Sequence, residues 1–375
     1  MELHLDALLT GLAQNKGSDL YLTADSPPLY RVDGATVPAM HHVMEATEVE
    51  QVVRGVLSPG EQEEFDRTRE LNVARMVPGV GRFRLNVFRQ RGQVGLVARI
   101  IPIEFPNAEQ LGLPSSLRDL IMQKRGLILV TGATGSGKST TLAALIDHRN
   151  LNSRGHILTI EDPIEFVHPH KGCVVTQREV GVDTASFAAG LKSALRQAPD
   201  VILIGEMRDV ETVEAAIHFA ETGHLVLGTL HANNANQAVE RVVNFFPQET
   251  HDALYPQLAL NLRGIVSQRL VPRADGKGRV AAIEVMLNSP RVADLIAKGE
   301  IAALKGAIEA NVQDGSRSFD QALYELHRAG LITLDEALRQ ADSANNLRLR
   351  IKMEAATPNP ADKPRFSLQS DSQAA

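Results

Sequence analysis

The segment GATGSGKS, residues 132–139, has the residue types and the spacing that hold phosphate groups in proteins. Its glycines let backbone N–H groups close around phosphates, and the helix start beyond it adds a favourable dipole. Lys138 is expected to reach the β- and γ-phosphates, and Ser139 to offer its hydroxyl to Mg²⁺. A strand pattern precedes the segment and a helical pattern follows it, which favours a nucleotide site over a glycine-rich turn. The residues expected to contact the nucleotide are Gly132, Ala133, Thr134, Gly135, Ser136, Gly137, Lys138, Ser139 and Thr140.

A second segment, VILIGEMRD at residues 201–209, has the pattern of a buried strand that ends in acidic residues. Glu206 is expected to orient and deprotonate the water that attacks the terminal phosphate. Phosphate-binding ATPases commonly hold Mg²⁺ with an aspartate in this segment, but this chain has Gly205 at that point. The missing carboxylate must therefore come from another part of the chain.

Acidic residues also follow another strand pattern, in the segment TIEDPIEF at residues 159–166. Because parallel sheets bind ligands at the carboxyl ends of their strands, Glu161 and Asp162 should converge with Glu206. We expect Ser139, Glu161 and Asp162 to hold Mg²⁺ or its bound water, and Glu161 to contribute to catalysis. Phosphoryl transfer depends mainly on positioning and charge stabilisation, so a relocated carboxylate is compatible with hydrolysis. The alternative for these acids is a solvated loop.

Two histidines belong to the segment TGHLVLGTLHANN, residues 222–234. His231 follows Thr229 at the expected end of a strand, and we expect it to sense the γ-phosphate. His224 stands before that strand, and its role is left open because a lone histidine is more often structural.

The nucleotide expected from the sequence is ATP. QNKGSD at residues 14–19 comes within one residue of the guanine-reading pattern N-K-x-D, but Ser18 stands where the aspartate is required. That segment also lies outside the phosphate-binding part of the chain. ATP and Mg²⁺ are therefore the expected cofactors.

The elements that must position these residues alternate between strands and helices from Gly126 onward. The apolar segments LILVTG, HILTIED, DVILIGE and HLVLGTLH have the pattern of strands buried on both faces, which predicts a parallel α/β sheet. Residues 125–285 form this expected core. A helical part at residues 286–352 follows it, and Thr333 with Glu336 marks one helix start there.

Residues 1–103 predict a separate small α+β domain. GRFRLNVF at residues 81–88 alternates apolar and polar residues and precedes a turn and a second strand pattern, which indicates a β-hairpin. The segments 47–50 and 58–61 both fit the capping box that opens a helix.

The proline-rich segment 104–124 is an expected linker, and residues 353–375 have too few apolar side chains to form a core, which predicts disorder.

The formal net charge of −6 gives no reason to expect nucleic acid as a partner. No apolar run approaches the roughly 18–20 residues that span a bilayer, and the N-terminus lacks the basic region of a secretory signal. The single cysteine, Cys173, excludes an internal disulfide, and we expect a cytoplasmic location.

Four motifs together resemble those of the ATPases of type II/IV secretion and type IV pilus systems. GATGSGKST, TIEDPIEF, LRQAPDVILIGEMRD and TGHLVLGTLHANNANQAVERVVNFFP are similar to that family's Walker A, Asp box, Walker B and His box. GSDLYLTADSPPLYRVDG, residues 17–34, resembles the start of its PAS-like N-terminal domain, and the likeness extends to about residue 352. The family's Walker B also has glycine in place of aspartate. The implied α/β fold is a small PAS-like α+β N-terminal domain followed by a RecA-like P-loop ATPase domain with a helical C-terminal part.

The resemblance also implies a homohexameric ring in which arginines of one N-terminal domain reach the nucleotide of the neighbouring subunit. The candidates on the expected hairpin are Arg82, Arg84 and Arg99, whose alternative is a solvated basic face. Further arginines without an assigned role are Arg208, Arg241, Arg263 and Arg269.

Assembly motors and type II secretion ATPases usually carry a four-cysteine zinc module and an extra N-terminal domain, and neither is expected here. The chain is similar instead to the retraction ATPases of the PilT/PilU subfamily. RVADLIAKGE at residues 291–300, Ala198 and the segment 318–352 look more like the PilU type. The implied function is a cytoplasmic motor at the base of the type IV pilus machine that drives or assists pilus retraction in twitching motility. The implied partners are further copies of itself, the inner-membrane platform protein of the pilus, which would hold it at the membrane's inner face, and a PilT-type ATPase.

Three other functions are compatible with a P-loop. An accessory ATP-binding subunit that depends on a PilT-type motor would dock more than it hydrolyses, although the intact Glu206 argues against an inactive site. A nucleic-acid translocase is disfavoured by the net negative charge and by the lack of an aromatic or basic strand-binding segment. A small-molecule kinase is disfavoured because no segment suggests an acceptor pocket.

Overall fold

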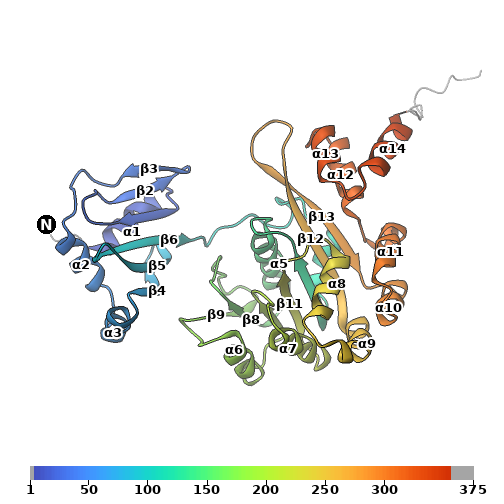
Figure 1. Ribbon diagram of the computed structural model, residues 1–375, viewed down its shortest axis with the longest axis horizontal. Coiled ribbons are helices and arrows are strands. Elements are labelled where there is room, and N and C mark those ends of the chain that lie inside the picture. The colour runs from blue at the N-terminus through green and yellow to red at the C-terminus, as the bar shows by residue number, and fades with distance from the viewer. Residues whose placement is uncertain (1–3, 356–375) are drawn as a thin grey trace, which may run out of the picture.

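A computed structural model of the protein, described here for residues 4–355, shows two bodies joined by a connecting segment (Figure 1). The smaller body is a six-stranded antiparallel sheet of order β3-β2-β1-β6-β5-β4, with three helices packed on one face. Its elements are α1 (Leu5–Gln14), β1 (Asp19–Leu22), β2 (Leu29–Val32), β3 (Ala35–Pro38), α2 (Ala46–Arg54), α3 (Pro59–Thr68), β4 (Glu70–Val77), β5 (Gly81–Gln90) and β6 (Gln93–Ile101).

The expected β-hairpin is confirmed by β5 and β6, which pair along their whole length in antiparallel register. Phe83, Leu85 and Val87 alternate along β5 and are almost fully buried against the three helices. Arg82 and Arg84 occupy the intervening positions and therefore lie on the opposite face of the sheet.

The two helix starts predicted in this body have different outcomes. Ser58 caps α3 in a capping box, as its pattern predicts. The prediction for residues 47–50 is wrong, because α2 begins at Ala46 and its capping box is formed by Glu45 and Glu48. The Glu48 carboxylate accepts the Glu45 N–H at 2.8 Å, which satisfies the free amide before the chain reaches the predicted start.

The larger body contains a seven-stranded sheet of order β13-β12-β7-β11-β10-β8-β9. All neighbouring strands are parallel except β12 and β13, so the predicted parallel α/β sheet is confirmed for β7, β8, β10 and β11. The elements of this body are α4 (Ser115–Ile121), β7 (Gly126–Thr131), α5 (Lys138–Asn152), β8 (Gly155–Glu161), β9 (Cys173–Glu179), α6 (Phe187–Ala194), β10 (Val201–Ile204), α7 (Val210–Glu221), β11 (Leu225–Leu230), α8 (Ala235–Asn244), α9 (His251–Asn261), β12 (Leu262–Pro272) and β13 (Arg279–Leu287).

Helices cover both faces of this sheet. Along β7, Ile128 and Val130 pack with α4 and α5, whereas Leu127 and Leu129 pack with α7, α8 and α9. Successive strand residues thus enter different apolar layers, as a strand buried on both faces requires. The carboxyl ends of the parallel strands meet at one edge of this three-layered body.

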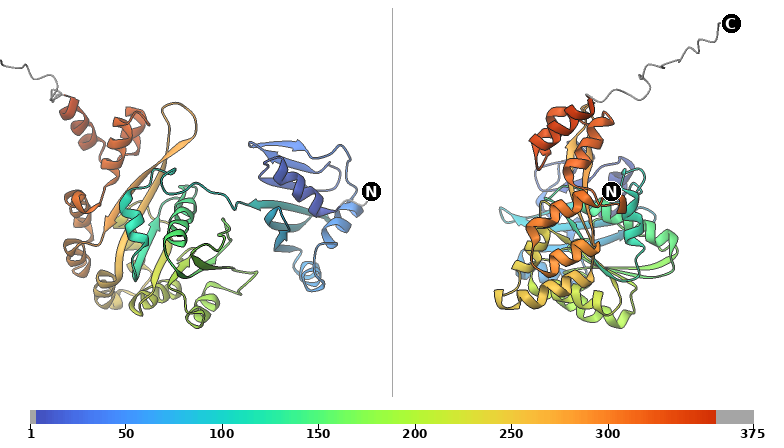
Figure 2. Two further views of the ribbon diagram at one scale, coloured as in Figure 1. Left: turned by 180° about the vertical axis from the view of Figure 1, so that it is seen from behind. Right: turned by 90° about the vertical axis from the view of Figure 1, so that its right-hand side faces the viewer.

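In the described part of the chain, five α-helices follow β13: α10 (Pro290–Ala297), α11 (Leu304–Ala310), α12 (Phe319–Arg328), α13 (Leu334–Gln340) and α14 (Ala344–Ala355). The last three gather beside the β12–β13 hairpin (Figure 2), and Phe319 and Leu323 belong to a separate apolar cluster that includes Val271 of β12. Thr333 caps α13, as predicted. α14 continues to Ala355, three residues into the segment 353–375 assigned to a disordered tail, and the rest of that segment lies outside the described residues.

The connecting segment is attached to the larger body at several points. The Val167 N–H donates to the Pro102 carbonyl at 3.1 Å, and the rings of Phe105 and Phe166 form a T-shaped pair with centroids 5.4 Å apart. Residues 115–121, within the segment assigned to a linker, form α4, whose buried side chains pack with those of α5. None of the helices in the described range is long and apolar enough to cross a membrane.

Candidate nucleotide site

The loop between β7 and α5 forms one wall of a cavity of ≈ 540 Å³ at the carboxyl ends of the parallel strands. A side chain at Gly132, where φ is +151°, would meet Ser136 Oγ at 2.4 Å and the Gln268 carbonyl at 2.6 Å. The turn therefore requires glycine. Because α5 begins at Lys138, its first N–H groups are free to bind an anion in the loop.

The side chain of Lys138 lies over this loop. Its Nζ donates to the carbonyl oxygens of Gly132 at 2.9 Å and Ala133 at 3.1 Å. Burial lowers the pKa of Lys138, and the negative charges of Glu206 and Glu165 oppose that effect. Loop residues that line the cavity are Thr134, Gly135, Gly137, Lys138, Ser139 and Thr140, whereas Gly132, Ala133 and Ser136 face a second cavity behind the loop.

Glu206 follows β10 and its carboxylate is held by two neighbours. Its Oε2 accepts from Arg208 at 2.5 Å, and its Oε1 lies 3.1 Å from His231 Nε2. The Arg208 guanidinium holds the pKa of Glu206 below its usual range, and the charges of His231 and Lys138 act in the same direction. The group is therefore a carboxylate at neutral pH and can accept a hydrogen bond from water.

Packing explains why glycine precedes this glutamate. A Cβ atom at Gly205 would lie 3.0 Å from Glu161 Cα and 3.1 Å from the Ile160 carbonyl oxygen on the neighbouring strand. These contacts are tighter than ordinary van der Waals distances, so an aspartate would crowd β8. Glu161 itself lines the same cavity. The structure thus supplies the carboxylate of Glu161, from β8, next to the position where Gly205 carries no side chain.

Two side chains orient Glu161. Its Oε1 accepts from Thr159 Oγ1 at 2.6 Å and from Gln177 Nε2 at 3.1 Å. Burial raises the pKa of Glu161, and these two hydrogen bonds oppose the shift. Gln177, on β9, also donates to the Phe166 carbonyl and accepts the His168 N–H, so it fastens the whole loop after β8. Sequence patterns did not identify Gln177, because its role depends on the pairing of β8 with β9.

Replacing Gln177 by methionine should lower the turnover of ATP about 10-fold while the protein still folds and binds ADP. The variant keeps the side-chain length but loses the hydrogen bonds that Gln177 makes to Glu161, to the Phe166 carbonyl and to the His168 N–H, each worth about 1 kcal/mol or more, while the Thr159 bond to Glu161 remains. Thr176→Val is the matched control, since Thr176 contacts His156 on the other face of β9. Steady-state phosphate release checks this, and equal turnover in the two variants would contradict it.

His231 reaches the site from the end of β11. Met207 N–H donates to the Thr229 carbonyl and Thr229 Oγ1 to the Gly205 carbonyl, so the ends of β10 and β11 are joined directly beside Glu206. This places His231 in contact with Glu206, a contact that the sequence patterns did not indicate, and the role of His231 as a sensor of the γ-phosphate stays a prediction. His224 lies at the other end of β11, where its Nδ1 is 3.1 Å from the Phe219 carbonyl oxygen, which indicates a structural role.

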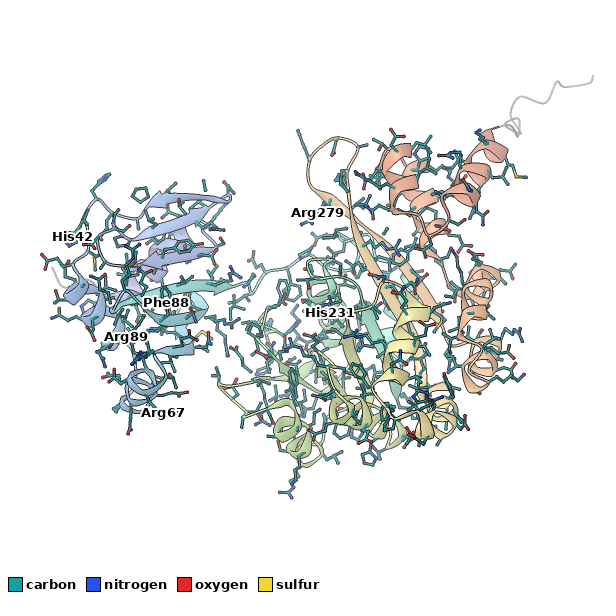
Figure 3. The ribbon with its side chains drawn as sticks, viewed as in Figure 1. His42, Arg67, Phe88, Arg89, His231 and Arg279 are labelled. Atoms are coloured by element: carbon teal, nitrogen blue, oxygen red, sulfur yellow. The ribbon has the colours of Figure 1, made fainter. Side chains whose placement is uncertain are left out.

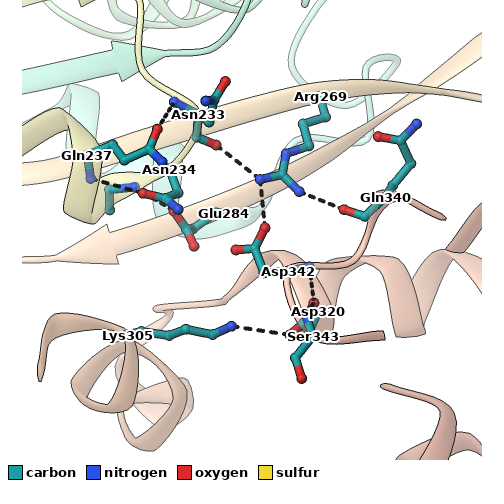
Figure 4. Close-up of polar contacts among 11 residues, drawn as sticks. Asn233, Asn234, Gln237, Arg269, Glu284, Lys305, Asp320, Gln340, Asp342 and Ser343 are labelled. Carbon is teal, nitrogen blue, oxygen red and sulfur yellow. Dashed lines mark hydrogen bonds and ion pairs between the residues drawn. The ribbon is translucent and has the colours of Figure 1, made fainter. Parts of the chain in front are cut away.

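Residues 231–234, here called the His231 loop, connect β11 to α8. The buried carboxyl group of Glu284 lies at the end of this loop. Glu284 Oε1 on β13 accepts the Ala235 N–H at 2.7 Å at the start of α8. Burial raises the pKa of Glu284 from 4.5 to about 7. Figure 4 shows this group beneath the loop, next to Arg269 and Asp342.

Replacing Glu284 by glutamine should stabilise the protein at higher pH. The folded state binds more protons than the unfolded state between pH 4.5 and about 7, so the free energy of unfolding falls as pH rises through that range. The full effect is roughly 3 kcal/mol above about pH 7. The difference in unfolding temperature between variant and wild type should therefore increase from about pH 5 to about pH 8. Glu240→Gln, on the exposed side of α8, is the control, and a pH-independent difference would contradict the prediction.

The candidate arginines of the small body are placed differently from one another. Arg82 Nη2 lies 3.1 Å from Glu179 of the same chain, and Arg99 donates to the buried Asp19 at 2.7 Å. Arg84, next to Arg99 across the hairpin, makes no ion pair or side-chain hydrogen bond within the described residues. In Figure 3 the end of β5 with Phe88 lies well away from His231. Of the arginines without an assigned role, Arg208 is the one at the cavity.

The oxygen-bearing side chains at this cavity are of the types that bind Mg²⁺ together with a nucleotide. Ser139, Glu161 and Asp162 all line it, and Asp162 is exposed. Within residues 4–355 no group of three or more His, Cys, Asp or Glu side chains is arranged to hold a metal ion by itself. Mg²⁺ typically keeps several waters and binds through one or two protein oxygens plus substrate phosphates, so such a cluster is not required.

The fold and the site define a class of protein. A parallel sheet with a glycine loop before α5, an amine over that loop, and carboxylates at the ends of β8 and β10 form a P-loop nucleotide-binding site on a RecA-like domain. The narrower grouping comes from comparison with known proteins.

The family model for "Type II/IV secretion system protein" matches residues 96–300. The chain is 51% identical over 351 residues to the type IV pilus ATPase PilU of Pseudomonas aeruginosa. The aligned region covers 94% of this chain and 92% of that protein. The chain is 42% identical to the type IV pilus retraction ATPase PilT of the same organism, over 90% of this chain and 98% of that one. A crystal structure of the pilus retraction motor PilT with bound ADP superposes with a TM-score of 0.86 at 41% identity, covering 93% of this chain and 100% of that chain. The chain belongs to the type II/IV secretion system ATPase family.

Proposed function

We propose that this protein is an ATP-hydrolysing hexameric motor at the base of a type IV pilus machine, where it drives or assists pilus retraction in twitching motility. The observation that carries the proposal is the convergence of Lys138, Glu161, Glu206 and His231 on one cavity at the phosphate-binding loop. The similarity to PilU and PilT over most of the chain supports the pilus role.

The residues divide the work of hydrolysis as follows. The loop amides and Lys138 bind the β- and γ-phosphates, and Glu206 orients the attacking water and takes its proton. Ser139, Glu161 and Asp162 would hold Mg²⁺ or its waters, and the ion would neutralise charge on the phosphates. His231 senses whether the γ-phosphate is present, and its Nε2 contacts the carboxylate of Glu206.

Completion of the site by a neighbouring subunit is part of the proposal. Arg84 has no partner among the described residues, and Arg82 and Arg99 have carboxylate partners that a competing phosphate could replace. The three side chains lie on the sheet face opposite the core of the small body, where a neighbour could approach. Arginine is suited to this because its planar fork matches phosphate oxygens.

The partners and the location belong to the same proposal. A pilus motor works in the cytoplasm, at the inner face of the cytoplasmic membrane, and acts on the inner-membrane platform protein. No nucleic acid is expected as a partner, since the net charge is −6.

A second candidate function is an accessory ATP-binding subunit that depends on a PilT-type motor, which the 51% identity to PilU favours. The two functions are separated by measuring pilus retraction force in cells that carry this protein with and without a PilT-type ATPase. A motor that acts alone retracts pili in both strains. An accessory subunit raises the force only when the other ATPase is present, and no effect in either strain would contradict both.

A further inference from the structure

Arg269, on β12, joins two parts of the larger body that are far apart in the chain. Its Nη2 donates to the Asn233 carbonyl at 3.2 Å and to Asp342 Oδ1 at 2.7 Å, and its Nη1 donates to the Gln340 carbonyl at 2.6 Å (Figure 4). Its guanidinium also lies 3.9 Å from the centre of the Phe319 ring. Asn233 belongs to the His231 loop, and the other three residues belong to the C-terminal helices α12–α14 and the turns between them.

The C-terminal end of this link is firmly held. Asp320 Oδ1 accepts the backbone N–H groups of Asp342 at 2.8 Å and Ser343 at 3.3 Å, and its Oδ2 lies 3.4 Å from Lys305 Nζ. The turn between α13 and α14 is thereby fastened to α12 and α11. A shift of these helices would therefore move Asp342 and the Gln340 carbonyl, and Arg269 with them.

The other end of the link lies next to the reacting groups. Asn233 is two residues after His231, whose Nε2 contacts Glu206. The loop is held on the α8 side by Gln237 Oε1, which accepts the Asn233 N–H at 3.2 Å, and by Asn234, which caps the helix. Arg269 adds a further hydrogen bond, to the Asn233 carbonyl, from the side of the C-terminal helices.

The chemistry of this link requires arginine. The guanidinium presents several N–H donors in one plane and stacks on an aromatic ring, so it can serve two carbonyls and a carboxylate at once. Lysine would keep the positive charge but could not make the same planar set of contacts. The charge and the fork geometry can therefore be tested separately.

We propose that Arg269 is a positioning residue for hydrolysis, which transmits the placement of helices α12–α14 to the His231 loop. The proposal rests on the proposed ATPase function and adds to it a route by which whatever binds or shifts the C-terminal helices alters turnover. Arg269 itself does not touch the reacting groups; it acts through the Asn233 carbonyl and His231.

The test compares the full-length Arg269→Lys variant with the wild type by hydrogen exchange and by ATP turnover. Exchange should become faster in residues 231–235 and 340–344 but not in the phosphate-binding loop, and kcat should fall about 10-fold with little change in KM. Arg273→Gln is the matched control, because Arg273 follows the same strand and pairs with Asp275 in the hairpin turn. That variant should leave both measurements unchanged.

Unchanged exchange at residues 231–235 in Arg269→Lys would overturn the proposal, and so would unchanged turnover when exchange has risen. If the lysine variant does not fold, Asp342→Asn replaces it, since it keeps Arg269 and removes its charged partner. Faster exchange in the same two segments is then the expected result, and its absence overturns the proposal. A wild-type protein without turnover contradicts the proposed function instead, while the exchange comparison still decides whether Arg269 holds the loop.

Discussion

Replacing Glu206 by glutamine should lower the rate of ATP hydrolysis by about 100- to 1000-fold. Glutamine keeps the side-chain volume and can still accept from Arg208, but it cannot take a proton from water. The pKa of Glu206 is lowered mainly by Arg208, so the wild-type carboxylate should remain charged well below neutral pH. Activity that depends on this group should therefore be lost only as the pH falls through that lowered pKa.

The measurement is steady-state phosphate release, with ADP affinity and oligomer mass recorded on the same samples. Glu214→Gln is the control, because Glu214 is exposed on α7 away from the phosphate-binding loop. If Glu206→Gln hydrolyses ATP at the wild-type rate, Glu206 does not have the role assigned to it.

Replacing Lys138 by glutamine should weaken ATP binding about 10-fold or more and lower turnover about 100-fold. The amine lies over the loop carbonyls and lines the cavity in which the β- and γ-phosphates would lie. Its loss removes charge stabilisation that increases as the phosphoryl group transfers. Glutamine also relieves the cost of the partly buried charge, so the variant should fold at least as well as the wild type.

Nucleotide affinity by calorimetry and turnover by phosphate release test this prediction. Lys192→Gln, on the exposed side of α6, removes the same charge elsewhere and should change neither value. A Lys138→Gln variant with wild-type affinity for ATP would show that the loop does not bind phosphate as described.

The phosphate-binding loop could be predicted because its geometry depends on adjacent residues. Gly132 and Lys138 are set by a turn between a strand and a helix, and both elements have clear local patterns. Glu206 and His231 could be placed for a related reason, since each follows the carboxyl end of a strand in the same parallel sheet.

Other parts of the site depend on contacts between distant segments and have no local signal. Gln177 orients Glu161 from β9, and Arg269 holds the His231 loop from β12. Neither strand was identified from the sequence, because β9 is an edge strand with a mixed polar and apolar pattern and β12 pairs on one side with the antiparallel β13. The incorrect capping prediction at residues 47–50 has a local cause, since two segments with the same spacing overlap there and Glu48 satisfies the earlier one.

The packing around Gly205 explains why the segment 201–209 has no aspartate and where the replacing carboxylate comes from. From the sequence, the absent aspartate implies only that a carboxylate must come from elsewhere. The structure shows that β8 leaves little room for a side chain at Gly205, and that Glu161 reaches the same cavity from that strand. The altered motif and the acidic segment after β8 are therefore two parts of one arrangement.

We propose that this chain forms a ring that hydrolyses ATP at the site built around Lys138, Glu161 and Glu206. The most direct test is phosphate release from Mg²⁺-ATP by the purified full-length protein, with its mass measured in the same solution. We expect sustained turnover by a hexamer that ceases when Mg²⁺ is chelated and when Glu206 is replaced by glutamine. A hexamer that binds ATP without turnover, or turnover that survives the Glu206→Gln substitution, would contradict the proposal.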